Sequence, residues 1–171
     1  YGVGNTGAFA DWSSDYRGRA DSGFDGDDAL TYPLETLREA VAAAHELGGR
    51  VAAHAFTRAG AEVAIAAGVD SLEHGWGLDE GLLQQMAARK TAWAPLAGIA
   101  SQMWRAALAD GDPDRAAWVA RCMERLAELL PRAVALGVRV LVGTDRFPEV
   151  TVGDEARQLH ELGLSRTQAL A

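Results

Sequence analysis

The chain has 171 residues, of which 49% are hydrophobic and 23% are charged. This composition is typical of one globular domain with a core, and it argues against a disordered chain. The net charge of −8 disfavours a nucleic-acid partner, because phosphates attract clustered Lys and Arg.

Membrane and export signals are not visible in the sequence. No apolar run reaches the roughly 18 residues that a membrane span needs, and no basic, apolar leader follows Tyr1. The single cysteine, Cys122, cannot form an internal disulfide. We therefore expect a cytoplasmic protein with no membrane association and no nucleic-acid partner.

Residues 1–33 are rich in Gly, Asp, Ser and aromatic side chains and show neither a helical nor a strand period. We expect a long loop here. Loops of this length are usually functional or disordered. The segment is either an active-site lid or an end left by a longer chain.

Regular patterns begin at Pro33, where apolar residues at helical spacing predict a helix that Gly48 ends. Thr57 and Asp79 are placed to cap two further helices, and Gly68 ends the first of these. The short apolar runs between the helices predict strands over residues 50–55, 69–74 and 91–95.

The second half of the chain begins with an irregular stretch and then a long helix from about Pro113. Pro131 is expected to break this helix and to begin another that ends at Gly137. Residues 138–144 are the most apolar predicted strand. Residues 154–162 predict a helix, and one more begins at Ser165.

Helices that alternate with apolar strands are typical of parallel β-α units, so the predicted fold class is α/β. Residues 1–171 are expected to form a single domain, with the β-α units in residues 34–171. Four strands are clear, whereas a (β/α)8 barrel needs eight strands and roughly 250 residues. The chain is therefore either an open sheet or about half a barrel.

Three of the predicted strands end in a residue that can hold a metal ion, namely His54, His74 and Asp145. The carboxyl ends of parallel barrel strands meet at one mouth, where catalysis takes place. Two imidazoles and a carboxylate are ligands that suit Zn²⁺. The sequence therefore predicts a metal site or a catalytic site at this end.

The runs VAAHA, AGVDSLEHG and ALGVRVLVGTD, followed by ELGLSRTQALA, resemble the amidohydrolase superfamily. The resemblance is to its imidazolonepropionase-like and Xaa-Pro-dipeptidase-like branch, and it extends from about Pro33 to Ala171. It implies a (β/α)8 barrel of which this chain holds strands five to eight. It also implies that His54, His74 and Asp145 bind metal and that Asp145 is the general acid and base.

The family also uses a His-x-His pair on the first strand and, in many members, a carboxylated Lys on the fourth. No His-x-His occurs in this chain, and its only Lys is Lys90. The resemblance thus implies one or two divalent ions, with zinc favoured, held by an incomplete set of ligands.

The resemblance implies hydrolysis of a C–N bond, in an amide or cyclic amide of a small molecule or dipeptide. The alternative is an inactive half-barrel fragment or an assembly module. Such a module would need a partner to complete the barrel, either a second copy in a homo-oligomer or the missing half.

The remaining candidate residues are assigned to structure. His45 is expected on the inner side of its helix and His160 on the surface. Strand alternation predicts that Glu73 points away from the interior, since its neighbour His74 points inward. Trp76 either lines the mouth or packs in the core, and Cys122 is expected to be buried and inert.

Overall fold

The computed structural model describes residues 5–9, 30–145 and 148–170. Four parallel strands form one sheet in the order β1 (Asn5–Phe9), β2 (Arg50–Ala55), β3 (Ser71–His74) and β4 (Ala92–Ala94). Their order in space follows their order in sequence. The carboxyl ends of all four strands therefore lie at the same edge of the sheet.

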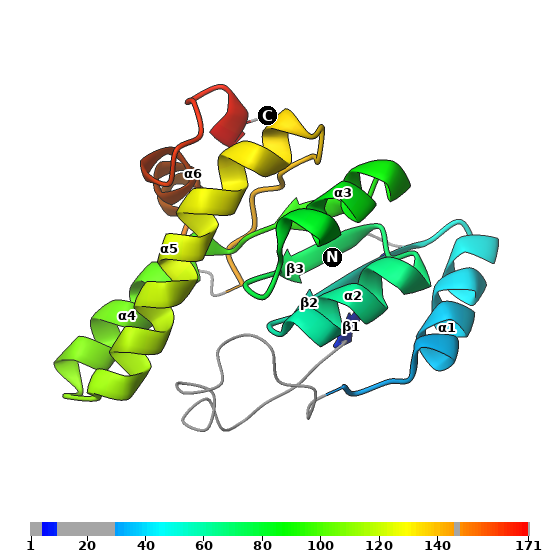
Figure 1. Ribbon diagram of the computed structural model, residues 1–171, viewed down its shortest axis with the longest axis horizontal. Coiled ribbons are helices and arrows are strands. Elements are labelled where there is room, and N and C mark those ends of the chain that lie inside the picture. Colours follow the sequence, from blue (N-terminus) through cyan, green and yellow to red (C-terminus); the bar gives the residue numbers. More distant parts are fainter. Residues whose placement is uncertain (1–4, 10–29, 146–147, 171) are drawn as a thin grey trace.

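Three helices follow one another along one face of the sheet (Figure 1). They are α1 (Leu34–Glu46), α2 (Arg58–Ala67) and α3 (Glu80–Arg89). The Thr57 side chain accepts a hydrogen bond from the Gly60 amide, and the Asp79 side chain accepts one from the Leu82 amide. Both helix starts, and the end of α2 at left-handed Gly68, are confirmed.

One part of the hydrophobic core lies between this helical layer and the sheet, and the rest includes buried residues of the helices that follow β4. Alternate residues of β2 and β3 point into it, with Val51, Ala53 and Leu72 buried. The intervening residues, Ala52 and Ser71, are only partly buried and face the other side. A cavity of about 230 Å³ lies against that opposite side.

The second half of the chain forms a layer of helices beside the sheet. Helix α4 (Ala97–Ala109) packs along one part of the longer helix α5 (Pro113–Ala135), as Figure 1 shows. Helix α6 (Val152–Glu161) contacts α4, and the short 3-10 helix η2 (Gln168–Leu170) follows it.

A buried carboxylate joins α6 to the start of α4. The side chain of Glu155 is fully buried and accepts hydrogen bonds from the amides of Ala97 and Gly98. Burial raises its pKa to about 7, although those two hydrogen bonds work in the opposite direction. Gly98 is needed here, since a Cβ would lie 2.7 Å from Val150 Cγ1 and 3.0 Å from Glu155 Oε2.

Four expectations from the sequence are corrected. Pro131 lies inside α5 and does not break it. The predicted strand over residues 138–144 is reduced to one bridge between Trp93 and Val140, because its neighbour β4 has only three residues. Helix α4 occupies much of the stretch read as irregular, and β1 lies inside the expected loop. Residues 1–4 and 10–29 of that expected loop or lid lie outside the described ranges.

None of the helices in the described ranges combines the length and the apolarity that crossing a bilayer requires.

Candidate active site at the carboxyl ends of the strands

Two histidines meet at the carboxyl ends of neighbouring strands. His54 lies near the end of β2 and His74 ends β3, with Ala55 paired to His74 across the ladder. His54 Nδ1 lies 3.1 Å from His74 Nε2. The sequence-predicted pair is therefore in direct contact through ring nitrogens that can bind a proton or a metal ion.

The chain turns sharply at His74. His74 and Gly75 both have a positive φ, of 63° and 62°, which is uncommon for a residue with a side chain. The Trp93 indole Nε1 donates a 2.8 Å hydrogen bond to the His74 carbonyl. A Cβ on Gly75 would lie 2.6 Å from that Nε1. Glycine at this position therefore leaves the space that the indole occupies.

Aromatic rings surround the His74 imidazole. Phe56 stacks on it with a centroid distance of 4.1 Å, and Trp76 meets its edge at 5.4 Å. Trp76 is itself buried and donates from Nε1 to the Pro95 carbonyl, so of the two expectations for it, core packing holds. Burial, with a smaller effect of His54, lowers the pKa of His74 to about 3. His74 is therefore neutral at physiological pH, the form that a metal ligand needs.

Asp145 approaches the same histidine from a third segment. Its Oδ2 lies 3.9 Å from His74 Nε2, and its own φ is 55°. The Asp145 side chain is 37% exposed, whereas that of His74 is 4% exposed. The three predicted residues thus converge, with the carboxylate on the solvent side of the histidine pair.

Glu73 is a fourth titratable residue at this end of the sheet. The predicted direction of its side chain, away from the interior, is wrong. Glu73 pairs with His54 across the ladder and accepts a hydrogen bond from Ser71. Burial raises its pKa, with a smaller contribution from the charge of Asp145. The reason for the correction is the positive φ of His74. His74 departs from the alternation of the strand, while Glu73 keeps to it on the face of His54.

The donor atoms fit part of a metal-ligand shell. Two nitrogens bound to a tetrahedral Zn²⁺ at about 2.0–2.1 Å lie roughly 3.3 Å apart, close to the separation seen here. Within the described residues, no group of three His, Cys, Asp or Glu side chains is placed so that it could hold a metal ion. Asp145 Oδ2 lies 3.9 Å from His74 Nε2, which is farther than two ligands of one tetrahedral zinc ion lie from each other.

The other titratable candidates lie away from this centre. His45 is exposed, contrary to expectation, and bonds Asp70 at 2.8 Å. His160 is on the surface as expected, with Nδ1 2.7 Å from the Leu164 carbonyl. Cys122 is buried, as expected, and burial raises the pKa of its thiol, which disfavours the reactive thiolate.

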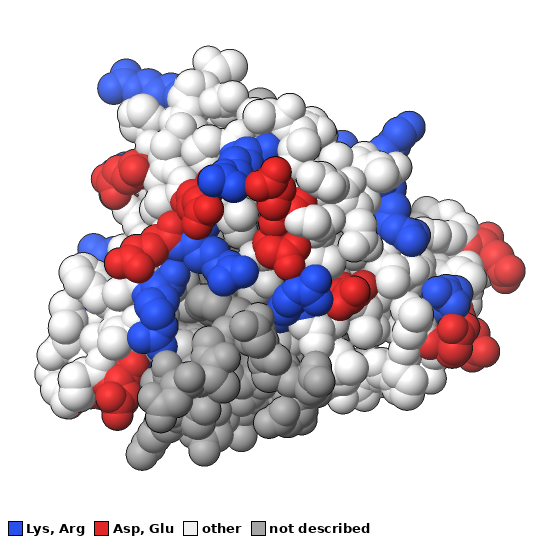
Figure 2. All heavy atoms as spheres, in the orientation of Figure 1, with Lys and Arg blue, Asp and Glu red and all other residues white. Residues whose placement is uncertain are grey.

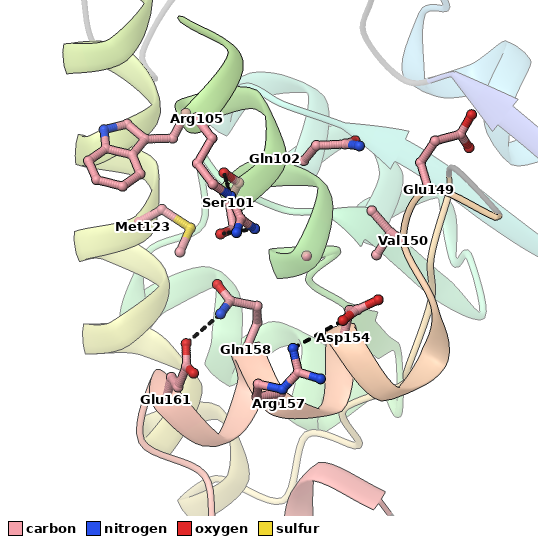
Figure 3. Close-up of a pocket in the computed structure, with 12 residues that line it drawn as sticks. Ser101, Gln102, Arg105, Met123, Glu149, Val150, Asp154, Arg157, Gln158 and Glu161 are labelled. Carbon is pink, nitrogen blue, oxygen red and sulfur yellow. Dashed lines mark hydrogen bonds and ion pairs between the residues drawn. The ribbon is translucent and has the colours of Figure 1, made fainter. Parts of the chain in front are cut away.

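A second cavity, of about 660 Å³, lies between α4, α5 and α6 (Figure 3). Its polar side chains are largely bonded to one another. Arg157 pairs with Asp154, Arg105 Nη2 donates to the Ser101 hydroxyl, and Gln158 donates to Glu161. Neither histidine of the candidate site lines this cavity. It therefore does not present a convergent set of reactive groups.

Solved structures share this arrangement of strands and helices. The chain superposes on ochratoxinase from A. niger with a TM-score of 0.77 at 21% identity, covering 98% of this chain and 37% of that one. A Xaa-Pro dipeptidase with bound methionine in its active site gives 0.71 at 24% identity, covering 85% of this chain and 37% of that one. An amidohydrolase gives 0.74 at 25% identity, covering 98% of this chain and 40% of that one.

The chain has the fold of the amidohydrolase family. The resemblance predicted from the sequence motifs is thereby confirmed. No protein-family model matches the chain. Uncharacterized proteins of Mycobacterium tuberculosis and Mycobacterium bovis are 32% identical to it over 149 residues, covering 85% of this chain. The chain spans about two fifths of the length of these relatives, since the match covers 40% of each. Phe56 and Trp93 are the residues around His74 that the sequence analysis missed, and Glu73 is the one that it assigned to structure.

Proposed function

We propose that the whole protein is a metal-dependent hydrolase that cleaves a C–N bond in a small amide, a cyclic amide or a dipeptide. One observation carries the proposal: His54 Nδ1 and Asp145 Oδ2 both approach His74 Nε2, at 3.1 Å and 3.9 Å, from three separate segments. Structural neighbours that are a Xaa-Pro dipeptidase and an amidohydrolase support it.

In this proposal, His54, His74 and Asp145 hold one or two divalent ions, with zinc favoured, as part of a larger shell. A bound ion of this type supplies Lewis acidity and brings the pKa of water close to 7. The aromatic pocket of Phe56 and Trp76 keeps His74 neutral and limits the directions in which its ring can turn.

Asp145 is the general base and acid. Its carboxylate is partly exposed and lies on the solvent side of the histidines, so a water molecule can reach it. It takes a proton from the attacking water and passes that proton to the leaving nitrogen. Water adds to the carbonyl carbon, the C–N bond breaks, and an amine and a carboxylic acid leave.

The chain is further proposed to be one domain, residues 1–171, that contributes strands five to eight of a (β/α)8 barrel. Strands β2, β3 and β4, followed by the bridge that joins Val140 to Trp93 of β4, lie side by side in sequence order and support this reading. The substrate is a small molecule in this proposal.

Metal affinity tests the site directly. Zinc titration by calorimetry should show that His54→Asn and Asp145→Asn each weaken binding by more than about tenfold. His160→Asn, at an exposed histidine outside the site, serves as the matched control and should bind zinc like the parent chain. Equal zinc affinity in all four proteins would contradict the proposal.

Hydrolysis by the complete protein tests the role of Asp145. Xaa-Pro dipeptides and small cyclic amides are suitable substrates for the first assays. The Asp145→Asn variant should lose about two to four orders of magnitude in kcat. Unchanged hydrolysis by that variant, with normal folding, would show that another group moves the proton.

The alternative function, an assembly module, has its own structural support. The side of the sheet that α1, α2 and α3 leave uncovered carries small, partly buried residues, Ala52 and Ser71, beside the cavity of about 230 Å³. Such a face can pack against strands of a second copy or of the other half of a barrel, which would pair with the sheet at its edges. A sharp dimer in light scattering favours assembly, and a monomer that binds zinc favours the hydrolase.

A further inference from the structure

The opposite end of the sheet holds a cavity of about 460 Å³. It is lined by the connections that lead into the strands, whereas His54 and His74 lie where the strands end. Arg50, the first residue of β2, lines it. His54 follows four residues later, which corresponds to about 13 Å along an extended strand. The cavity is therefore separate from the candidate active site.

Basic side chains dominate the wall of this cavity. Four cations line it, namely Arg50, Arg89, Lys90 and Arg139, against a single carboxylate, Asp70. These four cations and one carboxylate give the wall a positive formal charge in a chain whose net charge is −8. Within the described residues, none of the four cations forms an ion pair.

The Asp70 carboxylate is hydrogen-bonded to groups of the protein itself. Its Oδ2 accepts hydrogen bonds from the Val51 amide and from His45 Nε2, both at 2.8 Å. Burial works to raise the pKa of Asp70, but these two hydrogen bonds and the nearby charges of His45 and Arg50 outweigh it and keep the pKa low. Arg50 is the cation of this wall whose charge contributes to the low pKa of Asp70.

The backbone that carries the cations is well anchored. The Lys90 amide donates to Ala87 at the end of α3, and the Arg139 carbonyl accepts from the Trp93 amide at 2.9 Å. The side chains of all four cations are exposed. Fixed backbone positions with long, free basic side chains are suited to closing around an anion.

We propose that this cavity, lined by Arg50, Arg89, Lys90 and Arg139, binds a small molecule that carries a phosphate or diphosphate group. Guanidinium groups match phosphate oxygens with paired hydrogen bonds, and the ammonium of Lys90 adds a point charge. The cavity is larger than one phosphate ion, so it also has room for an organic part. The site is a second binding site on the protein, independent of the hydrolytic one.

A polymeric anion fits the molecule less well. On the face drawn in Figure 2, acidic and basic side chains are interspersed and the described residues form no continuous basic track. Nucleic acid needs such a track, because its phosphates repeat along the strand. A confined basic cavity on an acidic protein instead selects a ligand of limited size.

Calorimetry with inorganic pyrophosphate tests the proposal on the full chain. We expect saturable binding of one pyrophosphate, weakened by at least about tenfold in the double variant Arg89→Gln/Arg139→Gln. Arg105→Gln, at an exposed arginine on α4, is the matched control and should bind like the parent. Circular dichroism should show that all three proteins are folded.

Two further arms make the test decisive. His54→Asn should leave pyrophosphate binding unchanged, so that failure of the hydrolytic site and failure of this site are distinguishable. Vesicles that contain phosphatidic acid separate a lipid headgroup from a free ligand, and the proposal expects no sedimentation of the chain with them. Absent pyrophosphate binding, binding that the double variant retains, or binding to vesicles alone would each overturn the proposal.

Discussion

The two ends of the sheet differ in how they present charge. At the carboxyl ends, His54 and His74 are packed against aromatic rings, and the chain adopts left-handed turns at His74 and Asp145. At the amino ends, the cations around the 460 Å³ cavity are exposed. At the carboxyl ends, the properties of the titratable groups depend on burial and on a fixed geometry. At the amino ends, they depend on an excess of positive charge that is exposed to solvent.

This difference determines how each end should respond to change. Buried, closely packed groups are sensitive to added volume and to lost hydrogen bonds, because the surroundings cannot adjust. Exposed charges are screened by solvent and salt, so single substitutions there have small effects on stability. The following experiments test this comparison, beginning with the largest expected effect.

Gly75→Ala should destabilise the carboxyl end strongly. The new Cβ would lie 2.6 Å from Trp93 Nε1 and 2.8 Å from Leu78 Cδ1, at a φ of 62°. We expect a loss of about 3–4 kcal/mol in the free energy of unfolding, from the contacts and the backbone together. Urea unfolding measures it. Gly137→Ala is the control, since φ is also positive but no atom lies within 4 Å, and it should cost only about 1 kcal/mol.

The stability of the chain should carry a pH dependence from Glu155. Its pKa is raised to about 7 in the folded protein from an ordinary value of 4.5. The folded state therefore binds more protons between these values, and stability falls as pH rises from 4.5 to 7, by as much as about 3 kcal/mol. Urea unfolding across this range should show that Glu155→Gln flattens the slope. The same slope in both proteins would mean that other groups set it.

Trp93→Phe should show how much the indole hydrogen bond to the His74 carbonyl contributes. The ring remains, but the buried carbonyl loses its 2.8 Å donor. The expected loss is about 1–3 kcal/mol in unfolding free energy. Zinc affinity should fall together with stability if the turn at His74 fixes the imidazole. A stable variant with unchanged zinc affinity would show that Phe56 and Trp76 are sufficient to hold the ring.

Arg139→Gln should have the smallest effect, and in the opposite direction. Removing one of four clustered cations relieves repulsion, so the unfolding free energy should rise by a few tenths of a kcal/mol at low salt. The gain should disappear in high salt, because screening removes the repulsion. Thermal melting at two ionic strengths measures this. A clear loss of stability at low salt would mean that the Arg139 side chain has a structural partner.

The sequence predicted well those features that depend on local signals. Thr57, Asp79 and Gly68 mark helix boundaries by their own side chain or lack of one, and the structure uses them in that way. Helix α4 carries no such signal, since Leu96 precedes it and provides no side-chain cap. Strand β1 reads NTGAF and is recognisable only through its pairing with β2.

The residues of the site could be predicted where the ends of the strands could be predicted. His54 and His74 follow apolar runs and do meet, whereas the direction of Glu73 depends on the backbone turn at His74. That turn is stabilised by Trp93, which lies 19 residues away in sequence. Such a contact between distant residues leaves no pattern in the sequence around either of them.

The left-handed backbone at His74 and Asp145 also restricts which variants of this protein can be evolved in the laboratory. Residues branched at Cβ are poorly compatible with that conformation, whereas Asn, Asp, His and Gly adopt it more readily. Saturation libraries at positions 74 and 145 should therefore return folded clones mainly from this small set. A search for altered metal preference at positions 74 and 145 is best restricted to Asn, Asp, His and Gly. All twenty amino acids can be tested at position 54.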